Sequence, residues 1–441
     1  MAGEWREATL GDGPLEILDG DRGKNYPKQE DFALNGHCLF LNAGNVTTSG
    51  FNFSDCTYIS VERDAVLHKG KLRRHDIVLT TRGTVGNVAY FDDSIQHEHI
   101  RINSGMVIFR AHGQELSPRY LYMFLRSPMF RAQVESLRTG SAQPQLPIRD
   151  INRVEIPIPP FKEQQAIAHI LGSLDDKIEL NRKMNRTLET MAQAIFKSWF
   201  VDFDPVRAKA TGRDPILPKK IASLFADSFE DSDIGEIPRG WKVVPLPEAI
   251  AVNPSRPLRK GAVAPYLDMA NMPTQGHTPD VVIDRPFGSG MRFVNGDTLV
   301  ARITPCLENG KTAYVDFLED GQVGWGSTEY IVLHPKPPLP EGFAYCLARS
   351  DGFREFAIQS MTGSSGRQRV PAESLSHYLL VLPSKQVAER FEKLVHPLFV
   401  HANKAASENR TLTTLRDTLL PRLISRKLRV MSTNKFIGGL V

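Results

Sequence analysis

The stretch FKEQQAIAHILGSLDDKIELNRKMNRTLETMAQAIFKSW, from Phe161 to Trp199, decides the fold of this chain. Its apolar residues recur at alternating steps of four and three, with asparagines filling the gap, which is the spacing of a helix seam that packs against another helix. Pro159 and Pro160 stand where a helix can begin but cannot continue backwards. We therefore predict one helix of roughly 58 Å at ~1.5 Å per residue. Its seam consists of Ile167, Leu171, Leu174, Ile178, Asn181, Asn185, Leu188, Ala192, Ile195 and Trp199.

Taken alone, such a helix is typical of a homodimeric coiled coil or of an ordinary bundle. A second seam with the same spacing lies near the C-terminus, and the tetrapeptide Asn-Arg-Thr-Leu at 185–188 recurs at 409–412. We therefore expect the helices at 161–199 and 385–428 to pair with each other. We expect the pair to be antiparallel, because the chain then needs only a short step into its second domain. The second seam consists of Phe391, Val395, Leu398, Ala402, Ala405, Asn409, Leu412, Arg416, Leu419 and Leu423.

Two residues disturb the second seam. Pro397 predicts a kink near the start of its helix, because proline removes a helical hydrogen bond. Arg416 is the one seam position that is neither apolar nor asparagine. Both departures make strict symmetry between the two helices doubtful.

Composition places the chain among globular proteins. It has 441 residues, 41% hydrophobic and 24% charged, so we expect two or three domains. No apolar run approaches the ~18 residues of a membrane span, and MAGEWREATL does not have the features of a signal peptide, so we expect a cytoplasmic location without membrane contact. The four cysteines form no C-x-x-C pair, which argues against a disulfide framework and a thiolate zinc site. A net charge of +4 permits nucleic-acid binding without requiring it.

The sequence repeats itself at long range, which indicates a tandem duplication. Anchors of the first copy have partners in the second at a nearly constant offset. The clearest pairs are Phe40–Asn45 with Tyr266–Asn271, Asp76–Leu79 with Asp297–Val300, Tyr122 with Tyr345, Arg126-Ser127 with Arg349-Ser350, and Thr139-Gly140-Ser141 with Thr362-Gly363-Ser364.

Short apolar runs split by Gly, Asn and Pro predict a strand-rich α+β fold for each copy. In the first copy we expect strands at 76–81, 87–91 and 106–110, and a helical patch near 118–137. The predicted layout is a first recognition domain at 1–158, a central helix at 159–200, a linker at 201–239, a second recognition domain at 240–383, a C-terminal helix at 384–430 and a tail at 431–441. The linker is too polar and proline-rich for a further domain, although a short helix near 219–225 is expected.

Each stretch that resembles a catalytic or metal-binding motif lacks a residue that the motif requires. Gly310-Lys311-Thr312 resembles the end of a phosphate-binding loop, but Pro305 stands where that motif needs glycine. Ile158-Pro159-Pro160-Phe161 resembles the tetrapeptide of amino-methyltransferases, but Ile158 replaces the catalytic Asn or Asp. His97-Glu98-His99 has no second ligand pair at metal-binding spacing, so we predict no metal. We expect no catalytic residue and no bound cofactor.

Polar loops in both copies carry side chains suited to DNA. Arg and Gln can form bidentate hydrogen bonds with guanine and adenine, while Ser, Thr and Gly amides suit phosphates. Ordinary surface turns remain the alternative for any one such loop. The candidate DNA contacts are Thr81, Arg82, Thr84, Arg138, Thr139, Ser141, Gln143 and Gln145 in the first copy, and Arg302, Thr304, Thr362, Ser364, Ser365, Arg367, Gln368 and Arg369 in the second.

The chain resembles the specificity subunit of type I restriction-modification systems. The run at 139–144, then 156–160, then Glu163-Gln164-Gln165 and Leu174-Asp175 resembles that family's central border, and Gly235-Glu236-Ile237-Pro238 with Gly240-Trp241 resembles the start of its second domain. The resemblance extends to about Arg429. The second copy departs from it at 385–388, where Lys-Gln-Val-Ala replaces the Lys-Glu-Gln-Gln of 162–165.

The resemblance implies that each domain reads one half of a bipartite double-stranded DNA target and that the antiparallel helices hold the domains apart. It further implies two modification subunits carrying S-adenosylmethionine and the methyltransferase activity, and restriction subunits that use ATP. This chain would then be a non-catalytic DNA-binding subunit. The alternatives are a duplicated protein-binding scaffold with a coiled-coil spacer, and an enzyme whose site the sequence does not reveal.

Overall fold

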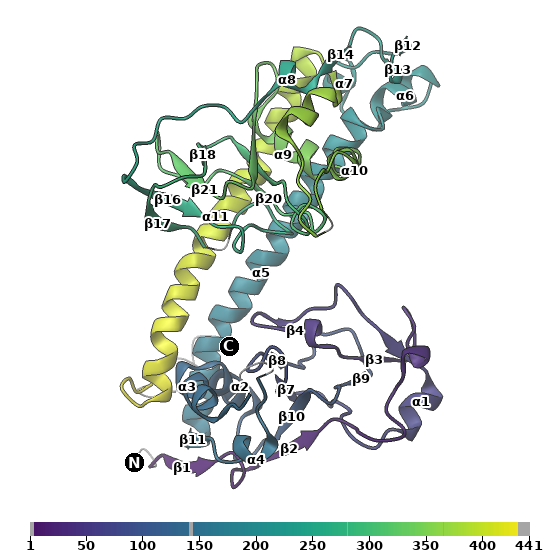
Figure 1. Cartoon of the computed structure of the whole chain (residues 1–441). Helices are drawn as coiled ribbons and strands as arrows, with labels where there is room; N and C mark the ends of the chain where they lie inside the picture. The colour runs from purple at the N-terminus through teal and green to yellow at the C-terminus, as the bar shows by residue number, and fades with distance from the viewer. Residues whose placement is uncertain (1–3, 141–143, 280, 365, 431–441) are drawn as a thin grey trace. The chain divides into compact units, whose positions relative to one another are not determined.

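The computed structural model describes residues 4–140, 144–279, 281–364 and 366–430 (Figure 1). These residues form two compact units. Unit 1 comprises the described residues up to 176 together with 412–430, and unit 2 comprises the described residues from 177 to 411. The chain is of mixed α+β class, as its sequence predicts.

Unit 1 is built on an antiparallel sheet in the order β2 (Leu15–Asp19), β10 (Met106–Ala111), β7 (Ile77–Thr80) and β8 (Val88–Tyr90). Successive side chains of a strand point to opposite faces, and both faces of this sheet are buried. Ile77 and Leu79 join the core that includes α2 (Pro118–Arg126) and α3 (Pro128–Leu137). Val78 joins the core on the opposite face.

A second small sheet of unit 1 has the order β6 (Tyr58–Ile59), β3 (Cys38–Phe40) and β9 (Ile100–Arg101), with β3 and β9 parallel. The remaining strands form two pairs, β1 (Arg6–Thr9) with β11 (Glu155–Ile158) and β4 (Val46–Thr47) with β5 (Gly50–Phe51). The short helices are α1 (Val61–Val66), α4 (Ile148–Ile151), η1 (Gln29–Asp31) and η2 (Ala43–Asn45).

Unit 2 contains an antiparallel sheet in the order β15 (Ile250–Val252), β22 (Tyr330–Pro335), β19 (Thr298–Ala301) and β20 (Thr312–Tyr314). A second sheet has the order β17 (Ile283–Pro286), β16 (Val263–Leu267), β21 (Gly324–Gly326) and β18 (Met291–Phe293), with β16 and β21 parallel. Strand β14 (Lys242–Pro245) pairs with β23 (Leu379–Leu382). The helices of this region are α8 (Leu246–Ala249), α9 (Glu341–Arg349), α10 (Asp351–Gln359) and η3 (Ala372–His377).

The three strands predicted in the first copy are confirmed as β7, β8 and β10. The helical patch predicted near 118–137 is confirmed and consists of two helices, because α2 ends at Arg126 and α3 begins at Pro128. Ser127 lies between them with extended backbone, and its hydroxyl accepts a hydrogen bond from the amide of Phe130 as the N-cap of α3. A capping serine followed by a proline at the first helical position is a strong start signal, and it separates the two helices here.

The two long helices are α5 (Phe161–Phe200) and α11 (Lys385–Ile424). The helix predicted from Phe161 to Trp199 is confirmed, and α11 ends four residues before the predicted end at 428. Helix α11 continues without a break through Pro397 and Arg416.

The predicted seam positions are all buried or half-buried, whereas Leu180, Met184 and Met191 on α5 and Leu415 on α11 are exposed. Ile167, Leu171, Ile178 and Phe391 are buried, and the half-buried seam residues are Leu174, Asn185, Leu188, Ile195, Leu398, Asn409, Leu412 and Leu419.

Contacts join the two helices inside each unit. In unit 1, Arg416 Nη1 lies 2.9 Å from Asp175 Oδ1. In unit 2, Asn181 Nδ2 donates to Asn409 Oδ1 at 3.0 Å, and the ring centroids of Phe200 and Phe391 are 5.0 Å apart. The contacts in unit 2 therefore pair a later residue of α5 with an earlier residue of α11.

The segment at 201–239 is more ordered than its composition predicts. It contains α6 (Asp204–Ala210), α7 (Lys219–Ala222) at the position of the expected short helix, and a hairpin of β12 (Phe229–Ser232) and β13 (Gly235–Pro238). Phe203 and Phe225 are buried in the core of unit 2, where the ring of Phe225 lies 4.9 Å from that of Trp199. The segment is therefore packed into the core of unit 2.

Candidate nucleic-acid interface

Two polar loops of unit 1 are joined by a short backbone ladder. Gln145 forms isolated β-bridges with both Arg82 and Thr139. The amide of Thr139 donates to Gln145 O at 2.9 Å, and the amide of Gln145 donates to Thr139 O at 2.8 Å. The amide of Leu146 donates to Thr81 O at 2.9 Å. Thr81 and Arg82 therefore lie together with Thr139 and Gln145, although 57 or more positions separate the two pairs in sequence.

Unit 2 repeats this ladder. Arg369 forms bridges with Ile303 and Thr362, and Arg369 and Thr362 exchange two backbone hydrogen bonds of 2.9 Å. The amide of Val370 donates to Arg302 O at 2.9 Å. Position by position, Arg369 corresponds to Gln145, Arg302 to Thr81, and Ile303 to Arg82. Arg302 and Arg369 in unit 2 and Arg82 in unit 1 therefore lie at different positions of the same backbone ladder.

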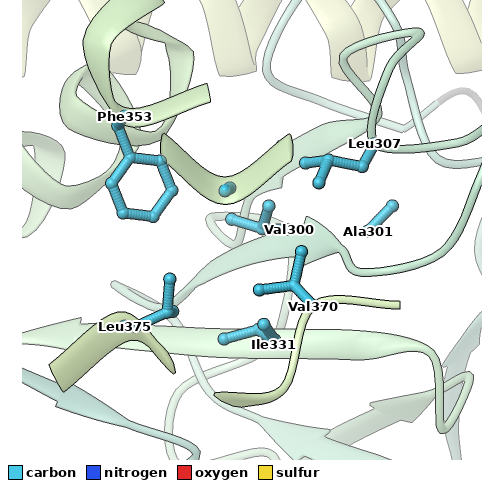
Figure 2. Close-up of a pocket in the computed structure, with 8 residues that line it drawn as sticks. Val300, Ala301, Leu307, Ile331, Phe353, Val370 and Leu375 are labelled. Carbon is cyan, nitrogen blue, oxygen red and sulfur yellow. The ribbon is translucent and has the colours of Figure 1, made fainter. Parts of the chain in front are cut away.

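Apolar neighbours hold the ladder of unit 2 in place. Ala301 and Val370 flank Arg302 and Arg369 and are buried. They line a small cavity together with Val300, Ile331, Phe353 and other apolar side chains (Figure 2). The cavity has a volume of about 10 Å³ and an apolar lining, so it has no room for an organic ligand. Its role is that of core packing behind the loops.

The candidate DNA contacts differ in exposure. Thr81 is 6% exposed and its backbone amide and carbonyl are both bonded, so it offers little surface to a ligand. Half-buried are Gln145, Arg302, Thr304, Gln368 and Arg369, and exposed are Arg82, Thr84, Arg138, Thr139, Thr362, Ser364 and Arg367. Ser141, Gln143 and Ser365 lie outside the described residues.

Three candidates already have partners within their unit. Arg138 Nη2 lies 2.9 Å from Glu135 Oε2. Thr304 Oγ1 accepts a hydrogen bond from the amide of Gln368 at 3.1 Å. Arg369 pairs with Glu329, whose hydrogen bonds raise the pKa of the guanidinium.

Glu329 is the functional candidate that sequence reasoning missed. It lies next to Arg369 although 40 positions separate the two in sequence. Its backbone carbonyl accepts from the amide of Arg302 at 3.0 Å, as Gly105 O accepts from Thr81 at 2.8 Å in unit 1. Glu329 therefore occupies the position of Gly105. The signal was present in the sequence, because extending the match between β10 and β22 by one residue aligns Gly105 with Glu329.

Metal-binding groups and membrane-spanning helices are both absent from the part of the chain that the structure describes. No group of three or more His, Cys, Asp and Glu side chains is arranged to hold a metal ion there. Among the same residues, no helix is long and apolar enough to cross a membrane.

Comparison with known proteins matches the first part of the chain to a described family. Residues 3–190 match the family described as "Type I restriction modification DNA specificity domain". This range includes all of the unit 1 ladder and most of α5, and it confirms the resemblance that the sequence indicates.

Curated relatives extend the likeness along the chain. The type I restriction enzyme HindI specificity subunit of Haemophilus influenzae is 24% identical over 96% of this chain and 99% of its own length. The MjaIX specificity subunit of Methanocaldococcus jannaschii is 26% identical over 80% of this chain and 78% of its own. The crystal structure of the S subunit from M. genitalium matches with a TM-score of 0.55 at 17% identity, covering 96% of each chain, which shows a shared fold.

Proposed function

We propose that this chain is the DNA-reading specificity subunit of a type I restriction-modification complex. The observation that carries the proposal is the repeated ladder, which gathers Arg, Gln and Thr residues at one place in each unit. Those side chains offer the donors and acceptors that base edges and phosphates require. The names of the relatives support the same assignment.

We further propose that each unit reads one half of a bipartite duplex target. The support is the shared strand order of the two main sheets, β2-β10-β7-β8 and β15-β22-β19-β20, together with the shared hydrogen bonds of the two ladders. These features are expected of a tandem duplication, and duplicated readers can recognise two separate sequences. The proposed domain boundaries follow the predicted layout, with recognition domains at 1–158 and 240–383 and long helices at 159–200 and 384–430.

We propose that α5 and α11 form an antiparallel coiled coil. Support comes from the burial of the predicted seam and from the order of the contacts in unit 2. Two modification subunits would bind the helical regions and supply S-adenosylmethionine and methyl transfer, and restriction subunits would supply ATP-driven cleavage. The chain itself would act in the cytoplasm as a non-catalytic subunit.

A protein-binding scaffold is the main alternative function. DNA binding by charged and polar side chains falls steeply with salt, because neutralised phosphates release counterions. We therefore expect the affinity of the chain for its duplex target, measured with its modification subunits, to fall by about 10³ between 50 and 200 mM salt. A scaffold would show no such affinity, and methylation by the purified chain alone would instead indicate an enzyme.

The target itself comes from a methylation map. Genomic DNA from cells with and without the gene should differ at one bipartite motif, and that motif supplies the duplex for the binding assay. A map without any difference, together with salt-independent binding, would contradict the proposal.

A further inference from the structure

Arg369 is held side-on by a carboxylate at the interface of unit 2. Its Nε lies 3.0 Å from both carboxylate oxygens of Glu329, and its Nη2 lies 2.9 Å from Oε1. Its Nη1 donates to Arg367 O at 3.3 Å. Both side chains remain accessible, with exposed fractions of 43% for Arg369 and 25% for Glu329.

This pairing leaves the end of the guanidinium fork for a ligand. Arginine carries five N–H groups, and these contacts occupy one on each of its three nitrogens. Two N–H groups therefore have no acceptor among the described residues, one on Nη1 and one on Nη2. Two parallel donors at that end match O6 and N7 of guanine, which is the commonest base-specific arginine contact in the major groove.

The negative charge of Glu329 argues against a phosphate contact. A carboxylate beside the guanidinium repels the DNA backbone and reduces the net charge available for phosphate attraction. It does not weaken the directional N–H donors, and it restricts the rotamers of a long side chain. An arginine that reads a base depends on directed N–H donors held in a fixed rotamer. An arginine that binds phosphate depends mainly on its net positive charge, which Glu329 reduces.

Unit 1 lacks this pair at the same positions. Gly105 occupies the place of Glu329, and Gln145 occupies the place of Arg369. Glutamine presents a donor and an acceptor that match N7 and N6 of adenine. The two units therefore carry different readers in one backbone frame.

We propose, on the basis of the function proposed above, that Arg369 reads a guanine in the half-site of unit 2 and that Glu329 is its positioning residue. Gln145, without a carboxylate beside it, reads an adenine at the corresponding place in the half-site of unit 1. The test uses the full chain with its modification subunits, and binding to duplexes in which each base pair of the target is varied in turn.

Four results are expected. Arg369→Ala weakens binding to the target roughly 10- to 100-fold and removes the preference for guanine at one position of one half-site. Arg369→Gln changes the preferred base at that position from guanine to adenine. Glu329→Gln lowers the preference for guanine there and strengthens binding to unrelated DNA, because a negative charge is lost. Arg119→Ala, which breaks the exposed ion pair with Asp176 and lies outside the candidate DNA contacts, leaves every base preference unchanged.

Three results would overturn the inference. If Arg369 contacts a phosphate, Arg369→Ala would weaken binding to all DNA sequences alike. The slope of log affinity against log salt concentration would then be smaller in magnitude by about 1. A merely structural pair would lower the melting temperature in both Arg369→Ala and Glu329→Gln without changing any base preference. In both cases the wild type still prefers a bipartite target, so the proposed function stands. A wild type without any sequence preference would reject the function and the inference together.

Discussion

Asn181 on α5 donates a hydrogen bond from Nδ2 to Oδ1 of Asn409 on α11, at 3.0 Å, inside the seam of unit 2. Asn181 is 1% exposed, and its Nδ2 also lies 2.7 Å from Glu408 Oε2. Asn409 in turn donates to the carbonyl of Ile178 at 3.3 Å. Polar residues at seam positions cost stability but can fix the register of paired helices.

The two asparagines should be energetically coupled. In a double-mutant cycle of Asn181→Ala and Asn409→Ala we expect a coupling free energy of about 0.5–1.5 kcal/mol. Either single substitution removes the hydrogen bond between the two side-chain amides. Chemical denaturation of the full chain, following the transition of unit 2, measures it. Thr187→Ala, at an exposed position of α5, serves as the uncoupled control. Additive effects within about 0.3 kcal/mol would show that the contact does not hold the helices in register.

Asp175 should be more important to unit 1 than its neighbour Asp176. Asp175 accepts from Arg126 Nη1 at 2.5 Å and from Arg416 Nη1 at 2.9 Å, and all three side chains are less than one-fifth exposed. Asp175→Asn leaves Arg126 without its counter-charge and leaves Arg416 with Asp417 as its remaining carboxylate partner, so we expect a loss of about 2–3 kcal/mol. Hydrogen-exchange mass spectrometry of peptides from α2 and α5 measures the change.

Asp176 provides the matched control for that experiment. It pairs with Arg119 at 3.1 Å, but the two side chains are 63% and 41% exposed, so Asp176→Asn should cost less than about 1 kcal/mol. Equal effects of the two substitutions would contradict the role of Asp175. Arg416→Leu should be milder than Asp175→Asn, because it restores an apolar seam and leaves Arg126 as a partner of Asp175.

Asp64 should make the stability of unit 1 depend on acid pH. Burial alone would raise the pKa of this carboxyl, but hydrogen bonds from Lys71 and Arg101 outweigh burial and lower the pKa to about 2 from 3.8. Because the folded pKa lies below the unfolded value, the stabilisation is present above pH ~4 and is lost as the pH falls through about 2. The difference corresponds to about 2 kcal/mol at neutral pH.

Thermal melting of wild type and Asp64→Asn between pH 7 and pH 2 tests this linkage. The wild type should melt at the higher temperature at pH 7, and the gap should narrow below pH 4. A gap that stays constant over this range would show that the ionised carboxylate contributes nothing to the fold.

Periodicity and internal repetition predict much of this fold. The four-three spacing identifies α5 because a helix seam repeats over many turns, and the strands β7, β8 and β10 follow from short apolar runs. Local capping signals set the boundaries within a predicted helical patch, as at Ser127, where a cap and a proline separate α2 from α3. Apart from the short helix near 219–225, the order of the segment at 201–239 does not follow from its sequence, because scattered aromatic residues such as Phe203 and Phe225 show no period until tertiary packing brings them together.

The candidate interface was predicted as residue types but not as geometry. The loops are identified by their polar composition and their repetition, but composition does not distinguish the exposed Arg82 from the buried Thr81. The register that aligns Arg302 with Thr81, and the pairing of Glu329 with Arg369, depend on hydrogen bonds between segments far apart in sequence. No local pattern reports such contacts, so the carboxylate beside Arg369 emerged only from the structure.

The central claim is that each unit reads its own half of a bipartite target, and a domain exchange tests it most directly. Residues 1–158 are replaced by the first domain of another specificity subunit, and the methylation map of the resulting cells is compared with that of the wild type. We predict a new sequence in one half-site and an unchanged sequence in the other. A map in which both halves change, or neither does, would contradict the account.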